Sequence, residues 1–581
     1  MRTTTDKLRT SRAARAPRAW AAAALAAGLV LAACGGSSDD DGPLVRTTAF
    51  GKLEGVDDSA RSGTWSWKGV PFAQPPVGAL RWRAPVDPAS WTGVRAASSF
   101  GAACLQNGRI YGPGANNRYD DTIASTLNQP VGSEDCLTLN VWRPATEQAD
   151  LPVIVFVYGG SNISGYTADP VYDGAALAKA ANAVVVTVNY RVGVLGFLSL
   201  PQLKTGQATD DSGNFALLDN LQALRYVQKN IAAFGGAPGN VTLMGQSAGA
   251  INAYALLASP LATGLFHKLI PLSGGISLAG NLPAGSLPTL NPASTYHAQR
   301  GGLLAQLLIA DGLATDAASA QAYAAAQGSA RIAEYLRAKD ARTILSTVLA
   351  KGLTGSGPIL DGNVLPTDPI AAIAAGRYQK VPVLAGMTAE EGKLFAPFLT
   401  LFGGKPGMKI GDAERFALMK NFNPDAPTSL TEGDILDASY VPSATPVTGY
   451  DAMTARLGKV FMAASRDNVL NTLAGQQSQV WYYEFAWTQL PAPWDKVYGA
   501  AHAFDLPFVF GNFGPSVFSN ATNSRANAPG RLALSKAMMD SVAAFARNGD
   551  PNHAGLGVSW RPWPAQLVFD ASRDATRIGT R

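Results

Sequence analysis

One serine is placed by its neighbours to act as a nucleophile. Ser247 is the centre of the pentapeptide G-Q-S-A-G at residues 245–249, the only copy of the G-x-S-x-G pattern in the chain. Residues 241–244 are apolar or β-branched, which is typical of a strand, and an Ala-rich helical pattern follows the serine. A strand that turns sharply into a helix lifts the hydroxyl clear of the backbone, and the two glycines permit a turn that a Cβ would block. The pattern predicts a nucleophile elbow.

A serine hydroxyl attacks only when a positioned base removes its proton, and that base is usually a histidine held by a carboxylate. The chain has four histidines, His267, His297, His502 and His553. In chains built around such an elbow the histidine comes last, after the final strands of the sheet. His502 lies in a small-residue loop after the strand expected near 479–487, whereas the others are expected in a core element, a helical insertion and a turn. His502 is therefore the predicted base.

The carboxylate is expected between the serine and the histidine, just beyond a strand. Residues 381–384 have the pattern of such a strand, and Glu390 and Glu391 follow it closely. Asp361, in a Leu-Asp-Gly turn, is a third candidate. Spacing alone does not choose between the two glutamates.

A Gly-rich loop at residues 158–165 directly follows the continuously apolar run 151–157. Free backbone N–H groups in such a loop can stabilise the oxyanion that develops during acyl transfer. Taken alone, the loop is more simply interpreted as a plain turn, and it is the elbow that favours the catalytic interpretation.

The elements that must position these groups alternate between strands and helices. Residues 151–157 and 183–188 are typical of buried strands, and leucines recur at helical spacing over 214–234. This alternation predicts an α/β architecture with a largely parallel sheet, whose sites lie at the C-terminal ends of the strands. Helical patterns at 290–350 and 400–475 are expected to form insertions that cover the site.

The first 33 residues have the composition of an export signal. A positively charged start is followed by an apolar stretch, Trp20–Ala33, that is too short to span a membrane. The stretch ends in Leu-Ala-Ala-Cys34, which resembles a bacterial lipobox, in which the cysteine is lipidated and becomes the mature N-terminus. The alternative is an ordinary cleaved signal with an incidental cysteine. Residues 34–45 are expected to form a flexible tether and 46–581 a single folded domain.

These features predict an exported bacterial protein. We expect it to be anchored by lipid to the cell envelope, at the outer membrane or the periplasmic side, or to be secreted. The formal charge of +5 and the pI near 8.9 come from the signal. Removing its six basic residues and one acidic residue from the totals of 47 and 42 leaves 41 of each. A neutral mature chain gives no support for binding nucleic acid.

Cysteine usage agrees with export. With Cys34 assigned to the lipid, Cys104 and Cys136 remain, and an oxidising compartment favours a disulfide between them. On the chain-entropy model, closing a loop of about thirty residues stabilises the fold by roughly 3 kcal/mol. Two cysteines and four scattered histidines show no metal-ligand spacing, so no metal site is predicted.

From Phe50 to the C-terminus the chain resembles the type-B carboxylesterase family, which includes cholinesterases and bacterial para-nitrobenzyl-esterase-like enzymes. The motifs that carry the resemblance, in order, occupy residues 68–81, 134–144, 188–193, 240–249, 391–392 and 499–511. The resemblance implies an α/β-hydrolase fold: a large, mostly parallel central sheet with helices on both faces and helical insertions over the active site. It implies a serine carboxylesterase that hydrolyses small-molecule esters through an acyl-enzyme, with no cofactor and no obligate protein partner.

The resemblance also implies residue roles. The family's acid directly precedes a glycine, which selects Glu391 as the partner of His502 in activating Ser247. The implied oxyanion donors are the N–H groups of Gly160, Ser161 and Ala248, and the family's first disulfide corresponds to Cys104–Cys136.

Three departures from the family pattern stand out. Gln246 replaces the usual glutamate before the nucleophile, Ser161 replaces the third glycine of the oxyanion loop, and residues 105–135 contain no tryptophan. Recognition of choline by cation–π contact therefore loses two supports. The alternative functions are a non-catalytic adhesion or binding member of the fold, and a hydrolase of amides, carbamates or polymer esters. Three aromatic residues are equally typical of a pocket or of the core: Tyr166, Trp481 and Trp487.

Overall fold

A single large sheet organises the chain. The computed structural model describes residues 42, 44–353, 356–516 and 519–581. Within these residues the largest sheet has eleven strands, in the order β18-β17-β16-β15-β12-β11-β9-β10-β8-β4-β3. Their bounds are β3 Val56–Asp57, β4 Thr64–Pro71, β8 Thr138–Pro144, β9 Leu151–Val157, β10 Val184–Val188, β11 Gly236–Gln246, β12 Lys268–Leu272, β15 Val383–Thr388, β16 Val480–Phe485, β17 Leu567–Phe569 and β18 Gly579–Thr580. All of them lie in the compact unit Arg46–Arg581.

The centre of this sheet is parallel and its edges are antiparallel. The seven consecutive strands β10, β9, β11, β12, β15, β16 and β17 pair in parallel with one another. β8, β4 and β3 on one side and β18 on the other pair antiparallel. Every residue of β9 and β10 is buried, which favours apolar residues along both strands because helices cover both faces of a parallel sheet. The one polar residue in them, Thr187, accepts a hydrogen bond from Asn140 Nδ2 at 3.0 Å.

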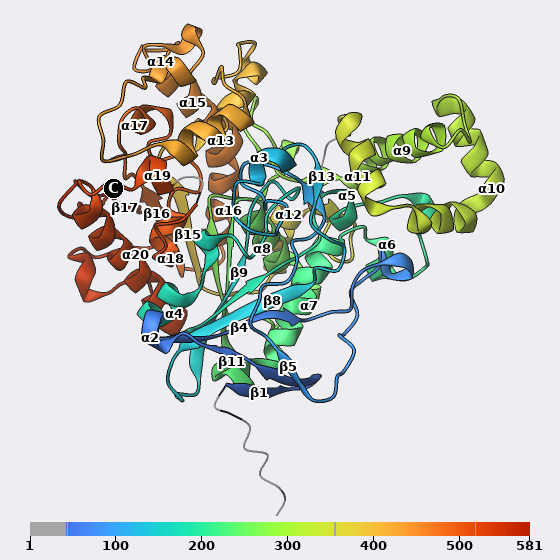
Figure 1. Cartoon of the computed structure of the whole chain (residues 1–581), viewed down its shortest axis with the longest axis horizontal. Coiled ribbons are helices and arrows are strands. Elements are labelled where there is room, and N and C mark those ends of the chain that lie inside the picture. The colour runs from blue at the N-terminus through green and yellow to red at the C-terminus, as the bar shows by residue number, and fades with distance from the viewer. Residues whose placement is uncertain (1–41, 43, 354–355, 517–518) are drawn as a thin grey trace, which may run out of the picture. The chain divides into compact units, whose positions relative to one another are not determined.

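Helices cover both faces of the sheet (Figure 1). On one face α4 (Ala175–Ala181) and α20 (Ala528–Asn548) contact each other, and both lie against central strands. On the other, α7 (Phe215–Asn230) and α8 (Ala248–Ala258) contact each other and β11. The architecture confirms the predicted α/β fold with a mostly parallel central sheet.

Two helical groups interrupt the alternation, as the sequence predicts. The first holds α9 (Ala293–Ala310), α10 (Ala317–Ala338) and α11 (Ala341–Ala350), which Figure 1 shows in yellow-green beside the sheet. The second, in orange, includes α13 (Asp412–Asn421), α14 (Glu432–Ile435) and α15 (Tyr450–Gly458).

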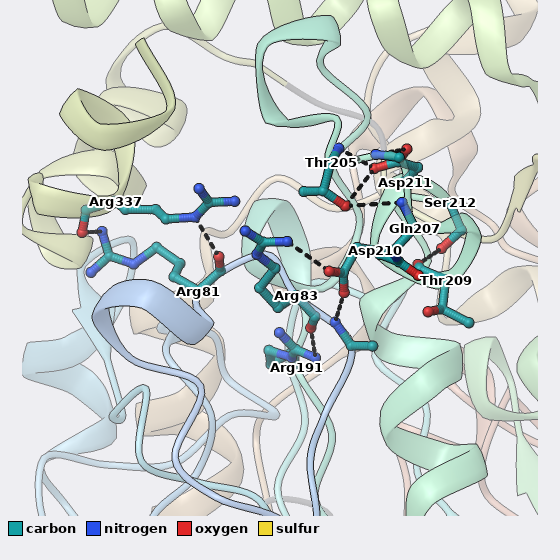
Figure 2. Close-up of polar contacts among 12 residues, drawn as sticks. Arg81, Arg83, Arg191, Thr205, Gln207, Thr209, Asp210, Asp211, Ser212 and Arg337 are labelled. Atoms are coloured by element: carbon teal, nitrogen blue, oxygen red, sulfur yellow. Dashed lines mark hydrogen bonds and ion pairs between the residues drawn. The ribbon is translucent and has the colours of Figure 1, made fainter. Parts of the chain in front are cut away.

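Arg81 joins the end of α10 to the body of the domain. Its Nε and Nη2 donate to the carboxylate of Glu134 at 2.6 and 2.7 Å. Its Nη1 donates to the main-chain carbonyls of Leu336, Arg337 and Lys339 at 3.2, 3.1 and 2.6 Å. Figure 2 shows the return contact, in which Arg337 Nε donates to the carbonyl of Arg81 at 3.2 Å. A cation here satisfies carbonyl groups that the end of a helix leaves unpaired.

A second arginine, Arg191, forms an ion pair with a residue in the first half of α7. Arg191, which follows β10, donates through Nε and Nη2 to both carboxylate oxygens of Asp219 at 2.8 and 2.7 Å, and both side chains are buried. Arg191 Nη2 also donates to the carbonyl of Arg83, whose own guanidinium pairs with Asp210 at 2.7 Å (Figure 2). These contacts explain why the motif at 188–193 contains an arginine.

Cys104 and Cys136 form a disulfide, with their Cα atoms 4.9 Å apart. No helix in the described ranges is both long enough and apolar enough to span a bilayer. The predicted signal segment and Cys34 lie outside the described residues.

Candidate active site

Ser247 occupies a sharp turn between β11 and α8. Its backbone has φ 56° and ψ −123°, in the left-handed half of conformational space. A Cβ at Gly245 would lie 2.3 Å from the carbonyl oxygen of Gly249, and a Cβ at Gly249 would lie 2.1 Å from that of Val157. Both glycines are therefore required by close backbone approach, and the elbow predicted at 245–249 is present.

His502 and Glu391 form a buried pair. His502 Nδ1 is hydrogen-bonded to Glu391 Oε2, and both side chains are 4% exposed. Glu391 Oε1 accepts from Ser273 Oγ at 2.6 Å and from Thr388 N at 2.8 Å. Burial raises the pKa of Glu391, but the facing His502 and these two hydrogen bonds bring it below its ordinary value of 4.5. The carboxylate is therefore charged near neutral pH and fixes the orientation of the imidazole.

The other carboxylate candidates face elsewhere. Glu390 pairs with Lys393 at 2.7 Å and accepts from Ala500 N at 2.8 Å. Asp361 accepts from the backbone N–H groups of Val364 and Leu365, both at 3.0 Å. Of the three acids that spacing left open, Glu391 is the one that contacts His502.

Two other histidines have local structural partners. His267 Nδ1 accepts from Val241 N at 3.1 Å. His553 begins a short 3₁₀ turn, and its Nε2 lies 3.1 Å from Ser541 Oγ. His297 is in α9.

Gln246 contacts the opposite side of the imidazole. Its Nε2 lies 3.2 Å from Nε2 of His502. When Nδ1 carries the proton that faces Glu391, His502 Nε2 is an acceptor and the amide of Gln246 donates to it. No hydrogen bond joins Ser247 Oγ to His502, both being in the described part of the chain. The resting contact of His502 Nε2 is thus with the neighbour of the candidate nucleophile.

The Gly-rich loop has an unusual backbone. Gly160, Ser161 and Asn162 have φ values of 117°, 58° and 56°, so three successive residues are left-handed. The amide of Asn162 exchanges two hydrogen bonds with that of Asn252 on α8, at 2.8 and 3.2 Å. This amide pair holds the loop on the helix that starts at the elbow, and within the described residues no acceptor faces the N–H of Gly160 or Ser161.

A cavity of about 490 Å³ connects these groups. Ser247, His502, Gly160 and Ser161 line it, whereas Glu391 lies behind the imidazole and Ala248 is buried at the start of α8. The structure therefore brings together all the site residues predicted from the sequence that lie in the described ranges, apart from the disulfide.

The residues that line the cavity show which of the three candidate aromatic residues and which predicted insertion contribute to its wall. Tyr166 and Trp487 line it, whereas Trp481 packs edge-on against Phe545. Asp412 and Arg415 of α13 bring the second insertion into the wall. None of the lining residues in the described ranges belongs to residues 290–350, so the expectation that this first insertion covers the site stays a prediction.

Sequence reasoning missed three contributors: Ser273, the contact of Gln246 with His502, and the Asn162–Asn252 pair. Ser273 directly follows β12, and a polar residue at the C-terminal end of a parallel strand is a signal that points to it. The other two join residues far apart in the chain and leave no local pattern. Among the described residues, no group of three His, Cys, Asp or Glu side chains could hold a metal ion.

Known proteins share this sequence and fold. The profile of the Carboxylesterase family matches residues 41–576. The chain is 33% identical to fumonisin B1 esterase of Sphingopyxis macrogoltabida over 519 residues, covering 88% of this chain and 83% of the relative. It is 31% identical to para-nitrobenzyl esterase of Bacillus subtilis (strain 168) over 520 residues, covering 89% and 92%.

A solved carboxylesterase of Geobacillus stearothermophilus superposes with a TM-score of 0.68 at 30% identity, covering 92% of this chain and 98% of that one. Sequence and fold agree along almost the whole length of both chains. The protein belongs to the carboxylesterase family and is a carboxylic ester hydrolase with the α/β-hydrolase fold.

Proposed function

We propose that this enzyme hydrolyses carboxylic esters through a Ser247–His502–Glu391 triad and an acyl-enzyme intermediate. The observation that carries the proposal is that Ser247, at its strained turn, and His502, which is paired with the buried Glu391, line the same cavity. A non-catalytic role is not favoured, because the nucleophile, the base and the acid are all present and the base and acid are paired.

In the first half-reaction Ser247 Oγ attacks the ester carbonyl carbon while His502 Nε2 takes its proton. The contact between Gln246 and Nε2 must open at this point, since one lone pair cannot accept from both groups. Glu391 stabilises the imidazolium that results. The N–H groups of Gly160, Ser161 and Ala248 stabilise the oxyanion, and the alcohol leaves with the proton from His502.

In the second half-reaction a water molecule gives a proton to His502 Nε2 and attacks the acyl carbon. The new tetrahedral intermediate collapses, Ser247 recovers its proton from His502, and the carboxylic acid is released. This chemistry acts on acyl groups generally, so amides, carbamates and polymer esters are further substrates to compare.

A single experiment tests the triad. The chain without residues 1–33 and its Ser247→Ala variant are assayed on para-nitrophenyl esters of increasing acyl length. We expect wild-type turnover and a loss of several orders of magnitude in the variant. A fluorophosphonate probe should label wild type at Ser247. An inert wild type that the probe fails to label would contradict the proposal.

We also propose that the enzyme is exported and anchored through lipid on Cys34. The support is the sequence of residues 1–45, with its charged start, apolar stretch and polar tether. Growth with a labelled fatty acid should label the wild-type protein and leave Cys34→Ala unlabelled. Equal labelling of both proteins would contradict the anchor.

A further inference from the structure

The three N–H groups proposed for the oxyanion hole come from two separate elements. Gly160 and Ser161 belong to the loop after β9, whereas Ala248 is the first residue of α8. An oxyanion gains most when its donors converge on one point, and a displacement of about 1 Å in an active site can lower the rate about a hundredfold. The loop and the helix must therefore be held at a fixed separation.

The loop contains a serine in a strained conformation. Ser161 has φ 58°, and it stands where the family pattern has a glycine. A left-handed backbone is unfavourable for a residue with a Cβ, whereas glycine adopts it freely. The side chain of Ser161 is exposed and makes no hydrogen bond within the described residues, so it does not hold this conformation itself. The restraint has to come from a neighbour.

Asn162, the next residue, is held through both its main chain and its side chain. Its carbonyl oxygen accepts from Gly193 N at 2.6 Å and from Ser356 Oγ at 3.0 Å. Its side-chain amide accepts from Asn252 Nδ2 at 2.8 Å and donates to Asn252 Oδ1 at 3.2 Å. Asn162 is 2% exposed and Asn252 0%, so movement of the loop would leave buried amide groups unpaired, which is unfavourable.

Asn252 connects this anchor to the other half of the oxyanion hole. It lies on α8 four residues after Ala248, and residues at this spacing share one face of a helix. The first turn of α8 is itself fixed, because Ser247 O accepts from the N–H groups of residues 250 and 251 at 2.9 and 3.0 Å. One pair of buried amides therefore joins the loop donors to the helix donor.

We infer that the Asn162–Asn252 amide pair positions the oxyanion hole and holds Ser161 in the left-handed conformation that leaves its N–H free. Neither asparagine is among the residues that line the cavity in the described ranges, so both are positioning residues. This role rests on the proposed esterase mechanism and deepens it. The pair compensates for the glycine missing at position 161, and a loop with glycine there needs no such restraint.

The test measures the cost of breaking the amide pair in two backgrounds. Asn252→Leu keeps the size of the side chain and removes both hydrogen bonds. In the wild-type background we expect kcat to fall about tenfold to a hundredfold with KM nearly unchanged, because the oxyanion donors act on the transition state. In the Ser161→Gly background the same substitution should lower kcat by about threefold or less, since glycine keeps the left-handed backbone without a restraint.

Asn220→Leu is the matched control. Asn220 is a 1% exposed asparagine on α7, and its Nδ2 donates to Ala216 O at 2.9 Å. The substitution removes a buried helix amide that does not contact the oxyanion loop. It should leave kcat within about twofold of wild type, whatever its effect on stability. Urea unfolding of each variant establishes that it is folded.

A trifluoromethyl ketone provides an independent measurement. Ser247 Oγ adds to its carbonyl carbon, the hydroxyl proton passes to His502, and the resulting hemiketal oxyanion occupies the hole. The inhibition constant should rise in Asn252→Leu by about the factor by which kcat/KM falls. Amide side chains do not titrate, so the acidic limb of the pH–rate profile should stay where it is in wild type.

Two outcomes would overturn the role of the pair: equal falls in kcat for Asn252→Leu and Asn220→Leu, or the same fall in both backgrounds. If Asn252→Leu does not fold, Asn252→Ser, which offers one hydroxyl in place of two amide bonds, is compared between the same backgrounds and judged by the same rule. Failure of the esterase mechanism would appear differently, as a wild type that is inert on every ester and is not labelled by the fluorophosphonate probe.

Discussion

The amide nitrogen of Gln246 lies 3.2 Å from His502 Nε2, the ring nitrogen that accepts the proton of Ser247 in the proposed mechanism. The side chain directly before the nucleophile therefore occupies the position that the nucleophile needs. Gln246 is buried and neutral, so this contact holds the imidazole without adding charge to the site. In the proposed mechanism, catalysis therefore includes an exchange of hydrogen-bond donors at His502 Nε2.

Gln246→Glu should change the pH dependence of the reaction. A carboxylate at this position would stabilise the imidazolium form of His502, which cannot act as a base. We expect the acidic limb of the kcat/KM profile to move upward by about one pH unit. The measurement is a pH–rate profile on a neutral ester, with Gln246→Met as the uncharged control of similar size. Coincident acidic limbs in the Glu and Met variants would refute the contact as a determinant of the base.

Ser273→Ala should weaken Glu391 as the acid of the proposed triad. Its hydroxyl is one of the two groups besides His502 that hydrogen-bond the buried Glu391 carboxylate. Without it we expect kcat/KM to fall about fivefold to tenfold. Ser277→Ala is the control, since Ser277 contacts Thr289 and Ser465. An equal fall in kcat/KM in the two variants would show that a general loss of packing, and not the lost hydrogen bond to Glu391, is responsible.

The lowered pKa of Glu391 predicts a dependence of stability on pH. A carboxylate whose pKa is depressed in the folded state stabilises the fold above its unfolded pKa. That contribution is lost as the pH falls below the ordinary value of 4.5 and through the lower folded value. Urea unfolding of wild type and Ser273→Ala should show a stability gap above this range that narrows as the pH falls through it, because the variant has less of this contribution to lose. If the stabilities of the two proteins instead changed in parallel with pH, the lowered pKa of Glu391 would not depend on Ser273.

Ser161→Gly should preserve catalysis. Ser161 has φ 58°, a conformation that costs a residue with a Cβ about 1–2 kcal/mol and that glycine adopts freely. We expect kcat/KM at or above the wild-type value, because the N–H donor survives. Ser161→Val should lower kcat/KM by about a hundredfold, since a β-branched residue resists this conformation and displaces the donor. An active Val variant would exclude this N–H from the oxyanion hole.

Arg81→Ala should destabilise the domain. The substitution leaves Glu134, whose side chain is 14% exposed, without its partner and frees the carbonyls at the end of α10. Breaking a buried ion pair lowers the free energy of unfolding by about 3–5 kcal/mol. The pair of Arg83 and Asp210, with an arginine side chain that is 31% exposed, provides the comparison, and Arg83→Ala should cost about 1 kcal/mol or less. Urea unfolding measures the free energy of unfolding of both variants. Equal losses would contradict the prediction that Arg81→Ala is the more destabilising substitution.

The sequence predicts the strands and the elbow well because their signals are local. Residues 151–157 are apolar without interruption, and the structure has β9 over the same residues. A run of this kind is stable only between two helical layers, so it also indicates the fold class. The elbow is equally local, since glycines at 245 and 249 follow from the crowding of one turn.

The choice between Glu390 and Glu391 is not local. A 3₁₀ turn over Glu391–Lys393 separates the two side chains, so that one meets His502 and the other meets Lys393. His502 is 111 residues away from Glu391, and no pattern near 390 encodes which glutamate it meets. Tyr166 and Trp481 show the same limit, because an aromatic residue that lines a cavity and one that fills the core have the same local sequence.

The attachment of α10 through Arg81 has a consequence for how this insertion can evolve. Arg81 Nη1 binds the carbonyls of residues 336, 337 and 339, and every amino acid supplies a carbonyl. Mutations that replace the side chains there leave these three bonds in place. The helical insertion can therefore diversify in sequence between related esterases while its junction with the catalytic domain is inherited unchanged.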